Sequence, residues 1–381
     1  MRLVRVLLSA RDPGGAAQVR AVAPALRADP RAAVSVTASG PAFDILKAAG
    51  QNPERFVLPD GSVHQEAGVD PAPLLGAAQA LLDRADPDAL VVGISSLGVG
   101  VDEALLARAG GRPTFALQDY PGDANAIAGA YAGRYFVRDE AAARLTRARF
   151  GAEAVPVGSL RHQAYARLDV PALRASTRAQ LGAGDHPVVG FFGQPPDIPG
   201  HEAAFGHLVE ALAARRAKPL LVLREHPKSR DRRAAHLDAL RAAGVRVHDA
   251  TDAGAVERWL AACDVVTTCF SHCAMDSAFL SAHSPEPLGS VLFLLTTSGA
   301  REFMRAYTGM PLPDGVEQGL GLVAESSADV GRLLERALTR DEQRAFHAAS
   351  LRLPRAARLD LIVETVVEAG RQRMARVGAP S

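Results

Sequence analysis

The feature that most constrains the fold of this chain is an alternation, run through twice, between short apolar runs and longer amphipathic segments. The first series places candidate strands at Leu3–Ser9, Ala33–Ala38, Ala89–Ile94, Thr114–Leu117, Arg134–Val137 and Ala154–Val157. Segments of helical length lie between them, at Gly15–Ala28, Pro41–Ala49, Pro71–Ala85, Gly100–Ala109 and Glu140–Phe150. Strands that alternate with helices predict βαβ units and a parallel sheet, with helices on both faces because such crossovers are right-handed.

The alternation begins again near residue 187. Its candidate strands are Val188–Phe192, Pro219–Leu223, Val245–Val247, Val265–Thr268, Val291–Leu295 and Leu320–Val323. Its candidate helices are Glu202–Arg216, Ala234–Ala243, Ala253–Ala262, Cys273–Ser281 and Ala328–Thr339. Because 381 residues exceed what one core usually supports, we predict two Rossmann-like α/β domains, over residues 1–165 and 186–345. A helical tail over 346–381 carries an apolar stripe and is expected to return toward the first domain.

Composition places the chain among ordinary globular proteins, with 48% hydrophobic and 22% charged residues. The formal net charge of +1 gives no reason to expect a nucleic-acid partner. Cys263, Cys269 and Cys273 match no common zinc pattern and imply no disulfide framework. No apolar stretch approaches the roughly 20 residues of a membrane span, and the N-terminus lacks a signal-peptide cleavage region. We therefore expect a cytoplasmic protein with no transmembrane segment.

Two strand ends of the second domain carry the densest polar chemistry. Ligands of open α/β sheets bind at the carboxyl ends of strands, and helix N-termini favour phosphate. The imidazole of His226, held before Pro227, can donate to phosphate oxygens while neighbouring cations add charge. The plain alternatives are a solvated basic loop and an N-cap at Ser271. The candidate nucleotide- and phosphate-binding residues are Arg224, His226, Lys228, Ser271 and His272, with Asp276 in reach of ribose hydroxyls and Gln194 in a Gly–Gln turn.

The loops that follow the strands of the first domain carry the candidate acids. The consecutive glycines Gly14 and Gly15 let a backbone approach a ligand closely at the start of a helix. The segment Gln118–Asn125 crowds two carboxylates and a phenol into a strand end, although a turn held by side-chain-to-backbone hydrogen bonds has the same composition. A general base is sought among Asp12, Asp119 and Asp123, and Gly14, Gly15, Ser95 and Tyr120 form the candidate acceptor-side loop.

Several cofactor signatures are missing from the sequence. There is neither a GxGxxG fingerprint nor a Walker A loop, so a nicotinamide dinucleotide or ATP site lacks support. No DxD motif lies at a suitable strand end. We therefore expect no cofactor and no requirement for a metal ion.

Over nearly its whole length the chain resembles the two-Rossmann-domain glycosyltransferase architecture called GT-B. The local pattern is most similar to bacterial nucleotide-sugar and CDP-polyol transferases, in which an HP motif is followed by a serine-containing helix start. Here His226-Pro227 and Ser271 stand at the matching places. The resemblance implies an interdomain cleft, nucleotide phosphates bound by the second domain, a base from the first, and a C-terminal helix that crosses back. His272, Cys273 and Ala274 replace residues typical of those transferases, which leaves the donor open.

The resulting prediction is a metal-independent glycosyltransferase that moves a sugar from a nucleotide-activated donor to a small or lipid-linked acceptor, with a homodimer also considered. His226 and the helix start would stabilise the leaving phosphate, and domain closure would exclude water. One alternative is a nucleotide-sugar 2-epimerase of the non-hydrolysing UDP-GlcNAc type, which has the same architecture. It ranks second because the acidic residues that such enzymes place near the sugar are not evident after Arg224 or Ser271. Another alternative is a non-catalytic nucleotide-sugar binding protein.

Overall fold

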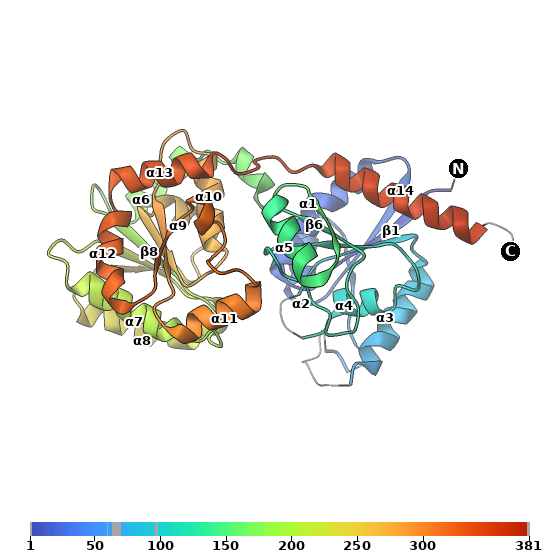
Figure 1. Cartoon of the computed structure of the whole chain (residues 1–381), viewed down its shortest axis with the longest axis horizontal. Coiled ribbons are helices and arrows are strands. Elements are labelled where there is room, and N and C mark those ends of the chain that lie inside the picture. The colour runs from blue at the N-terminus through green and yellow to red at the C-terminus, as the bar shows by residue number, and fades with distance from the viewer. Residues whose placement is uncertain (1, 59, 63–69, 96–97, 379–381) are drawn as a thin grey trace. The chain divides into compact units, whose positions relative to one another are not determined.

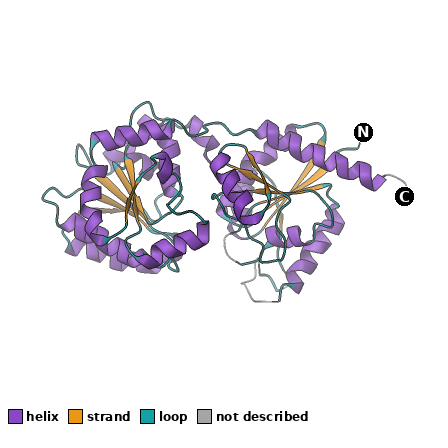
Figure 2. Cartoon of the chain, in the orientation of Figure 1, coloured by secondary structure: helices purple, strands orange, loops and turns teal. Residues whose placement is uncertain are grey.

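The computed structural model describes residues 2–58, 60–62, 70–95 and 98–378; Ser96, in the loop that holds Ser95, lies outside this range. The chain divides into two compact units, each with helices around a central sheet (Figures 1 and 2). Unit 1 consists of Met1–Gln163 together with Ala356–Ser381, and unit 2 of Ala164–Arg355. The two Rossmann-like α/β domains expected from the sequence are confirmed.

In the described part of unit 1, seven parallel strands form one sheet in the order β3-β2-β1-β4-β5-β6-β7. Successive residues of a strand face opposite sides of a sheet, and both sides of β1 are buried. Val6 and Leu8 enter one hydrophobic cluster while Leu7 enters the other. The strands are β1 Val4–Ala10, β2 Ala32–Ala38, β3 Glu54–Arg55, β4 Ala89–Val92, β5 Thr114–Leu117, β6 Arg134–Val137 and β7 Glu153–Pro156.

The helices of unit 1 cover both faces of this sheet. They are α1 Pro13–Ala28, α2 Gly40–Ala48, α3 Ala72–Ala85, α4 Val101–Ala107, α5 Glu140–Phe150 and α14 Leu359–Gly378. A 3-10 helix, η1 Arg161–Arg167, spans the point where the chain passes from unit 1 to unit 2.

In unit 2 the described residues give a six-stranded parallel sheet in the order β10-β9-β8-β11-β12-β13. The order reverses between β8 and β11, and the carboxyl ends of these two strands form the topological switch point. The strands are β8 Val188–Phe192, β9 Leu220–Arg224, β10 Val247–Asp249, β11 Val265–Thr268, β12 Ser290–Leu294 and β13 Leu322–Ala324.

The helices of unit 2 again lie on both sides of the sheet. They are α6 Val170–Gln180, α7 His201–Ala213, α8 Arg233–Ala242, α9 Val256–Ala262, α10 Cys273–Ala282, α11 Ser298–Thr308, α12 Ser327–Ala337 and α13 Arg340–Ser350, with 3-10 helices η2 Pro227–Arg232 and η3 Val316–Gln318. Helix α11 has no counterpart among the helices expected from the sequence.

The C-terminal tail forms two helices that belong to different units. Helix α13 packs into unit 2 through Phe346 and Ala349. Pro354 lies between the two helices, where it disfavours a continuous helix because proline has no backbone N–H. Helix α14 then lies against α1, β1 and β4 of unit 1 and buries Ile362 and Val366 there (Figure 1). The return to unit 1 thus begins at Ala356, ten residues later than the bound expected from the sequence.

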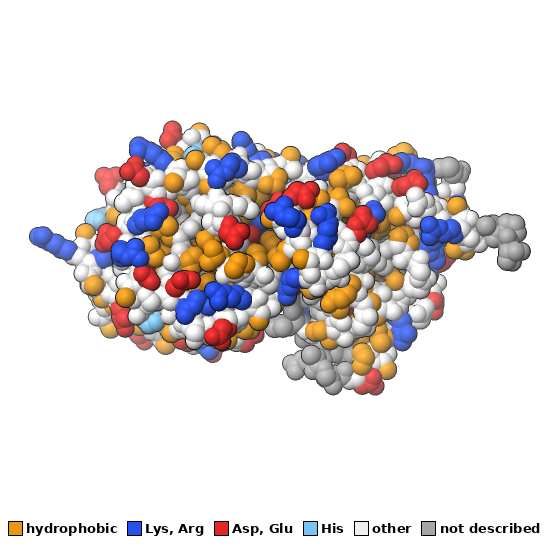
Figure 3. All heavy atoms as spheres, viewed as in Figure 1, with side chains coloured by type: hydrophobic (Ala, Val, Ile, Leu, Met, Phe, Trp, Pro, Cys, Tyr) orange, Lys and Arg blue, Asp and Glu red, His pale blue; other side chains and the backbone are white. Residues whose placement is uncertain are grey.

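Acidic and basic side chains are interspersed over the face of the molecule shown in Figure 3. Within the residues that the structure covers, no helix is both long enough and apolar enough to cross a bilayer.

Candidate functional site

In unit 2, Gln194 joins the three strand ends that surround the switch point. Its backbone carbonyl accepts a hydrogen bond from the Ser229 hydroxyl at 2.8 Å, and its side-chain Oε1 accepts one from the backbone N–H of Phe270 at 2.7 Å. Gln194 follows β8, Ser229 lies in η2 after β9, and Phe270 follows β11. Gln194 therefore links the turn that holds His226, through its backbone carbonyl, to the turn that holds Ser271, through its side chain.

His226 stands at the end of β9 with its ring half-buried at the sheet edge. Its backbone is extended (φ −67°, ψ 144°), as expected before Pro227. Nδ1 accepts a hydrogen bond from the backbone N–H of Lys228 at 3.2 Å, so a neutral ring carries its hydrogen on Nε2. Burial and the nearby Lys228 charge lower the pKa of His226, which favours this neutral form. The ring is thus a single N–H donor at the carboxyl edge of the sheet.

The Ser271 turn leads into α10. The Ser271 hydroxyl oxygen accepts a hydrogen bond from the backbone N–H of Cys273 at 3.3 Å, and half-buried His272 occupies the N-cap position. Asp276, one turn into the helix, has no exposed surface and so faces the interior of unit 2. His226 and the Ser271 turn are therefore polar groups at this edge, whereas both ring nitrogens of His272 are buried.

Two of the predicted phosphate-binding cations are placed differently from His226. The Arg224 guanidinium donates to the carbonyls of Ala250 at 2.8 Å and Gly254 at 3.1 Å, and so fastens the loop after β10. Lys228 is exposed to solvent. Arg224 is therefore held by backbone carbonyls, whereas the Lys228 ammonium lies in solvent.

In unit 1, the three predicted carboxylates gather at the carboxyl edge of the sheet. Asp119, after β5, accepts from Gln18 Nε2 at 3.3 Å and pairs with Arg161 at 3.5 Å. Asp12, after β1, lies 3.5 Å from the Arg11 guanidinium. The turn at Gly14 passes so close to Asp119 that a Cβ there would collide with the carboxylate. A side chain at position 14 would displace the Asp119 carboxylate.

The pKa of Asp123 is displaced toward neutrality. Burial is the largest cause, and the charges of Asp119 and Asp12 add to it, against the opposing charge of Arg149. Together they raise the pKa of Asp123 to about 7. A carboxyl group with such a pKa can both accept and return a proton near neutral pH, which suits a general acid–base role. Asp123 is therefore a candidate general base; the sequence alone left it equivalent to Asp12 and Asp119.

A second pair of acids, Asp102 and Glu103, is buried beneath this edge and was not anticipated from the sequence. Both oxygens of Asp102 accept from hydroxyls, those of Ser9 and Ser95. Glu103 accepts from the backbone N–H of Gly100 at 2.8 Å. Burial and the charge of Asp102 raise the pKa of Glu103 to about 8, partly offset by Arg11, and burial also raises that of Asp102.

The remaining residues of the predicted acceptor-side loop also lie at this edge. Gly15 and Gly93 approach so closely that a Cβ on either would contact the other backbone at 3.3 or 3.2 Å. Ser95 is buried and, as described, donates to Asp102, while Tyr120 is half-buried beside Asp119. Ser95 thus contacts the buried carboxylate of Asp102, and Tyr120 lies at the surface of the site.

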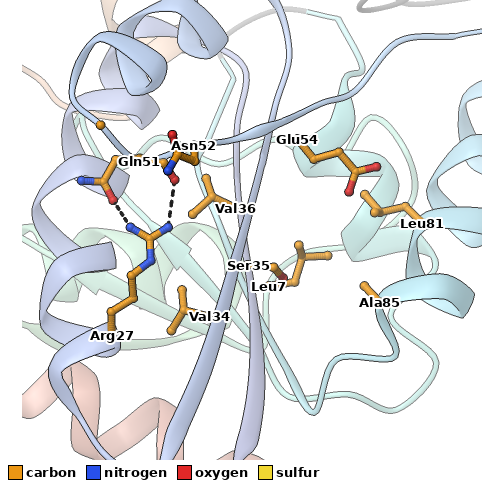
Figure 4. A pocket seen from close by; sticks show the side chains of 11 residues that line it. Leu7, Arg27, Val34, Ser35, Val36, Gln51, Asn52, Glu54, Leu81 and Ala85 are labelled. Carbon is orange, nitrogen blue, oxygen red and sulfur yellow. Dashed lines mark hydrogen bonds between the residues drawn. The ribbon is translucent and has the colours of Figure 1, made fainter.

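A cavity of about 570 Å³ lies elsewhere in unit 1, along the side of β2 where the two-residue β3 leaves that strand unpaired (Figure 4). Val34 and Val36 line it on one side and Leu81 on the other. Arg27 donates to the side chain and carbonyl of Gln51 at its margin. It is built from strand middles and helix ends, so it is separate from the carboxyl edge.

Among the described residues, no group of three or more His, Cys, Asp or Glu side chains is arranged to hold a metal ion.

No protein-family model matches the chain, and no curated protein matches its sequence. Solved structures match over the full length. UDP-GlcNAc 2-epimerase from Neisseria meningitidis, bound to UDP-GlcNAc, has a TM-score of 0.68 at 11% identity, over 96% of this chain and 100% of that one. The Methanocaldococcus jannaschii UDP-GlcNAc 2-epimerase has a TM-score of 0.63 at 12% identity, over 95% and 99%. Anabaena HepE in complex with UDP and glucose reaches 0.56 at 16%, over 98% and 99%.

These similarities establish a GT-B architecture for the chain. They also correct the predicted function. The glycosyltransferase prediction is wrong, because the solved structures that match this chain over its full length are repeatedly UDP-GlcNAc 2-epimerases. The HP motif misled the sequence interpretation, since one fold hosts many unrelated functions and a short motif at a strand end does not choose between them.

Proposed function

We propose that the protein is a nucleotide-sugar 2-epimerase that acts on a UDP-linked sugar. The observation that carries the proposal is the match of the whole chain to UDP-GlcNAc 2-epimerases, one of them holding UDP-GlcNAc. The polar residues at the two sheet edges support it, because each edge supplies one half of the chemistry that such a reaction needs.

Unit 2 is proposed to bind the nucleotide. Neutral His226 presents Nε2–H, and the Ser271–His272 turn begins α10, whose N-terminus favours a phosphate. Gln194 holds these two turns together, so both donors are fixed before a ligand arrives. Donors fixed in advance stabilise a departing diphosphate without reorganisation in the transition state.

Unit 1 is proposed to transfer the proton at C2 of the sugar. Inversion at C2 requires that the C2–H bond is broken and that a proton returns on the opposite face of the sugar. In an enzyme of the non-hydrolysing type, the nucleotide leaves C1 only transiently and rejoins it, so no acceptor and no water are consumed. Asp123, with a pKa of about 7, is proposed to take the proton from one face of C2, and a second carboxyl group of this edge, Asp12 or Asp119, to return a proton on the opposite face. Burial, together with the charges of Asp119 and Asp12, maintains the raised pKa of Asp123.

The test is incubation of the purified protein with UDP-GlcNAc in D₂O, followed by NMR spectroscopy. The proposal expects deuterium at C2 and the appearance of the 2-epimer, with no net release of UDP. Binding of UDP without any exchange at C2 would replace the epimerase with a non-catalytic nucleotide-sugar binding protein. Complete release of UDP and free sugar would instead indicate a hydrolase.

A further inference from the structure

A buried series of three ionisable side chains starts at the residue that precedes His226. Oε1 of Glu225 lies 2.6 Å from Nδ1 of His236, and Nε2 of the same ring lies 3.0 Å from Oε2 of Glu202. The Glu225 side chain is fully buried and that of His236 is 5% exposed, whereas that of Glu202 is 53% exposed. The series therefore links the interior of the His226 turn to the solvent-facing start of α7.

The protonation state of His236 follows from this geometry. Each ring nitrogen faces a carboxylate oxygen, and only a protonated imidazole has two N–H donors. Burial by itself lowers the pKa of His236, but the hydrogen bonds and charges of Glu225 and Glu202 outweigh it and raise the pKa above its usual value. The imidazolium is therefore the form that fits between the two acids.

Other elements around His236 are consistent with a single buried cation. Phe205 of α7 stacks on the ring at 3.9 Å between centroids. His201, also on α7, has its ring centroid 6.3 Å away, and burial lowers its pKa, so it adds no second positive charge. Arg232, at the end of η2, pairs with the other oxygen of Glu202 and holds that carboxylate in place.

Glu225 transmits this arrangement to His226 through the backbone. Adjacent residues of an extended segment point to opposite sides, so the buried Glu225 carboxylate directs His226 outward. Gly193 packs directly against this turn and leaves no room for a side chain. A Cβ there would lie 2.9 Å from Oε2 of Glu225 and 3.1 Å from the backbone nitrogen of His226. Pro227 restricts the backbone on the other side.

We propose that His236 is a positioning residue for His226: as an imidazolium between Glu225 and Glu202, it fixes the Glu225–Pro227 turn so that Nε2–H of His226 meets a nucleotide phosphate. The identity of the ligand, a nucleotide phosphate, rests on the proposed function. The effect on the His226 ring does not, and it can be measured without a ligand.

The experiment compares the wild-type protein with His236→Gln, which retains one donor and one acceptor but no charge. Nitrogen-15 NMR of the histidine rings reports the tautomer of His226, and calorimetry with UDP reports phosphate binding. We expect a single Nε2–H tautomer in the wild type and a mixture in the variant, with UDP affinity reduced about tenfold. The contribution of the imidazolium is present at low pH and is lost as pH rises through the raised pKa of His236. The affinity difference between the two proteins should therefore shrink on the alkaline side.

Two further variants make the result decisive. His248→Gln, on β10 and outside the network, is the matched control and should leave both readouts unchanged. Glu202→Gln alters the exposed end of the series, where unfolding is least expected, and should give a smaller loss in the same direction. If His236→Gln fails to fold, Glu202→Gln carries the same comparison.

Wild-type values for both the tautomer and the UDP affinity in a folded His236→Gln protein, or in Glu202→Gln where it carries the comparison, would overturn the proposal. If the wild type binds no UDP, the proposed function fails, and the tautomer of His226 alone decides whether His236 positions it.

Discussion

The two sheet edges are built alike and filled differently. In unit 1 the strand ends carry carboxylates, three near the surface and two buried beneath, and arginines oppose them. In unit 2 they carry imidazoles, a hydroxyl and a carboxamide, and the carboxylate of Glu225 is turned inward. The same βαβ frame therefore presents carboxyl groups at one edge and imidazole and hydroxyl groups at the other. This difference teaches that in an open α/β sheet the topology sets the edge at which a ligand can bind, while the loop residues set the chemistry available there.

The most severe test of this contrast is Asp123→Asn. Removing a group that transfers the proton is expected to lower kcat for epimerisation by about 10²–10⁴-fold. The rise in rate through about pH 7, which follows ionisation of Asp123, should disappear with it. UDP affinity should stay within twofold, because the change lies in the other unit. Exposed Asp83→Asn, on α3, is the control. An active Asp123→Asn protein would remove proton transfer from this position.

His226→Gln tests the opposite edge. Loss of an N–H donor to a charged phosphate is expected to weaken UDP binding about 10–100-fold in calorimetry. The matched control is His283→Gln, at the other end of α10 from Ser271. Equal losses in both variants would mean that the effect is general to unit 2 and that His226 makes no phosphate contact.

Glu103→Gln tests whether the deeper acids of unit 1 carry the titration proposed for them. The folded-state pKa of Glu103 is raised to about 8, so the native state holds a proton that the unfolded chain has released above about pH 4.5. Stability of unit 1 should therefore fall as pH rises from about 4.5 to 8. The variant cannot ionise there, and the fall should be smaller by at least about 1 kcal/mol. Urea denaturation at pH 5.5, 7 and 8.5 measures it, and an unchanged slope would contradict the raised pKa.

The smallest expected effect is that of EDTA. With imidazole and helix N–H groups at the phosphate edge, epimerisation should stay within twofold after chelation, in the wild type and in His226→Gln alike. A rate that falls with EDTA and returns with magnesium would show that the nucleotide edge depends on a bound cation.

Most of the fold could be predicted because apolar runs in parallel sheets are short and buried on both sides. Thr114–Leu117, Arg134–Val137 and Val265–Thr268 occur with the bounds that the sequence indicates. Helix α11 had a readable signal that was missed: Thr297 accepts a capping hydrogen bond from Ala300, and Gly309 ends the helix at φ 73°. Strand β3 had no readable signal in the sequence. Its two residues are exposed and charged, and they form a strand only because they pair with the edge strand β2.

The site could be predicted only as far as strand ends reveal it. His226 and Asp123 follow apolar runs, and that position marked them. In the sequence, Asp102 and Glu103 look like an ordinary acidic first turn of a helix. In the structure they are a buried pair beside Ser9 and Arg11, which come about 90 residues earlier in the chain. His236 sits in an amphipathic helix like many surface histidines. Its partners, Glu225 and Glu202, come from separate elements, so no local pattern indicates the network.

The placement of α14 has a consequence for synthesis. Unit 2 is continuous in the chain, whereas unit 1 lacks Ile362, Val363, Val366 and Val367 until residues after Ala356 are made. On a ribosome, the middle of the protein can therefore complete its core while the beginning still exposes an apolar strip over α1 and β1. The part of the chain made first is the last to close, and a truncation after Arg355 would damage the N-terminal unit and spare its neighbour.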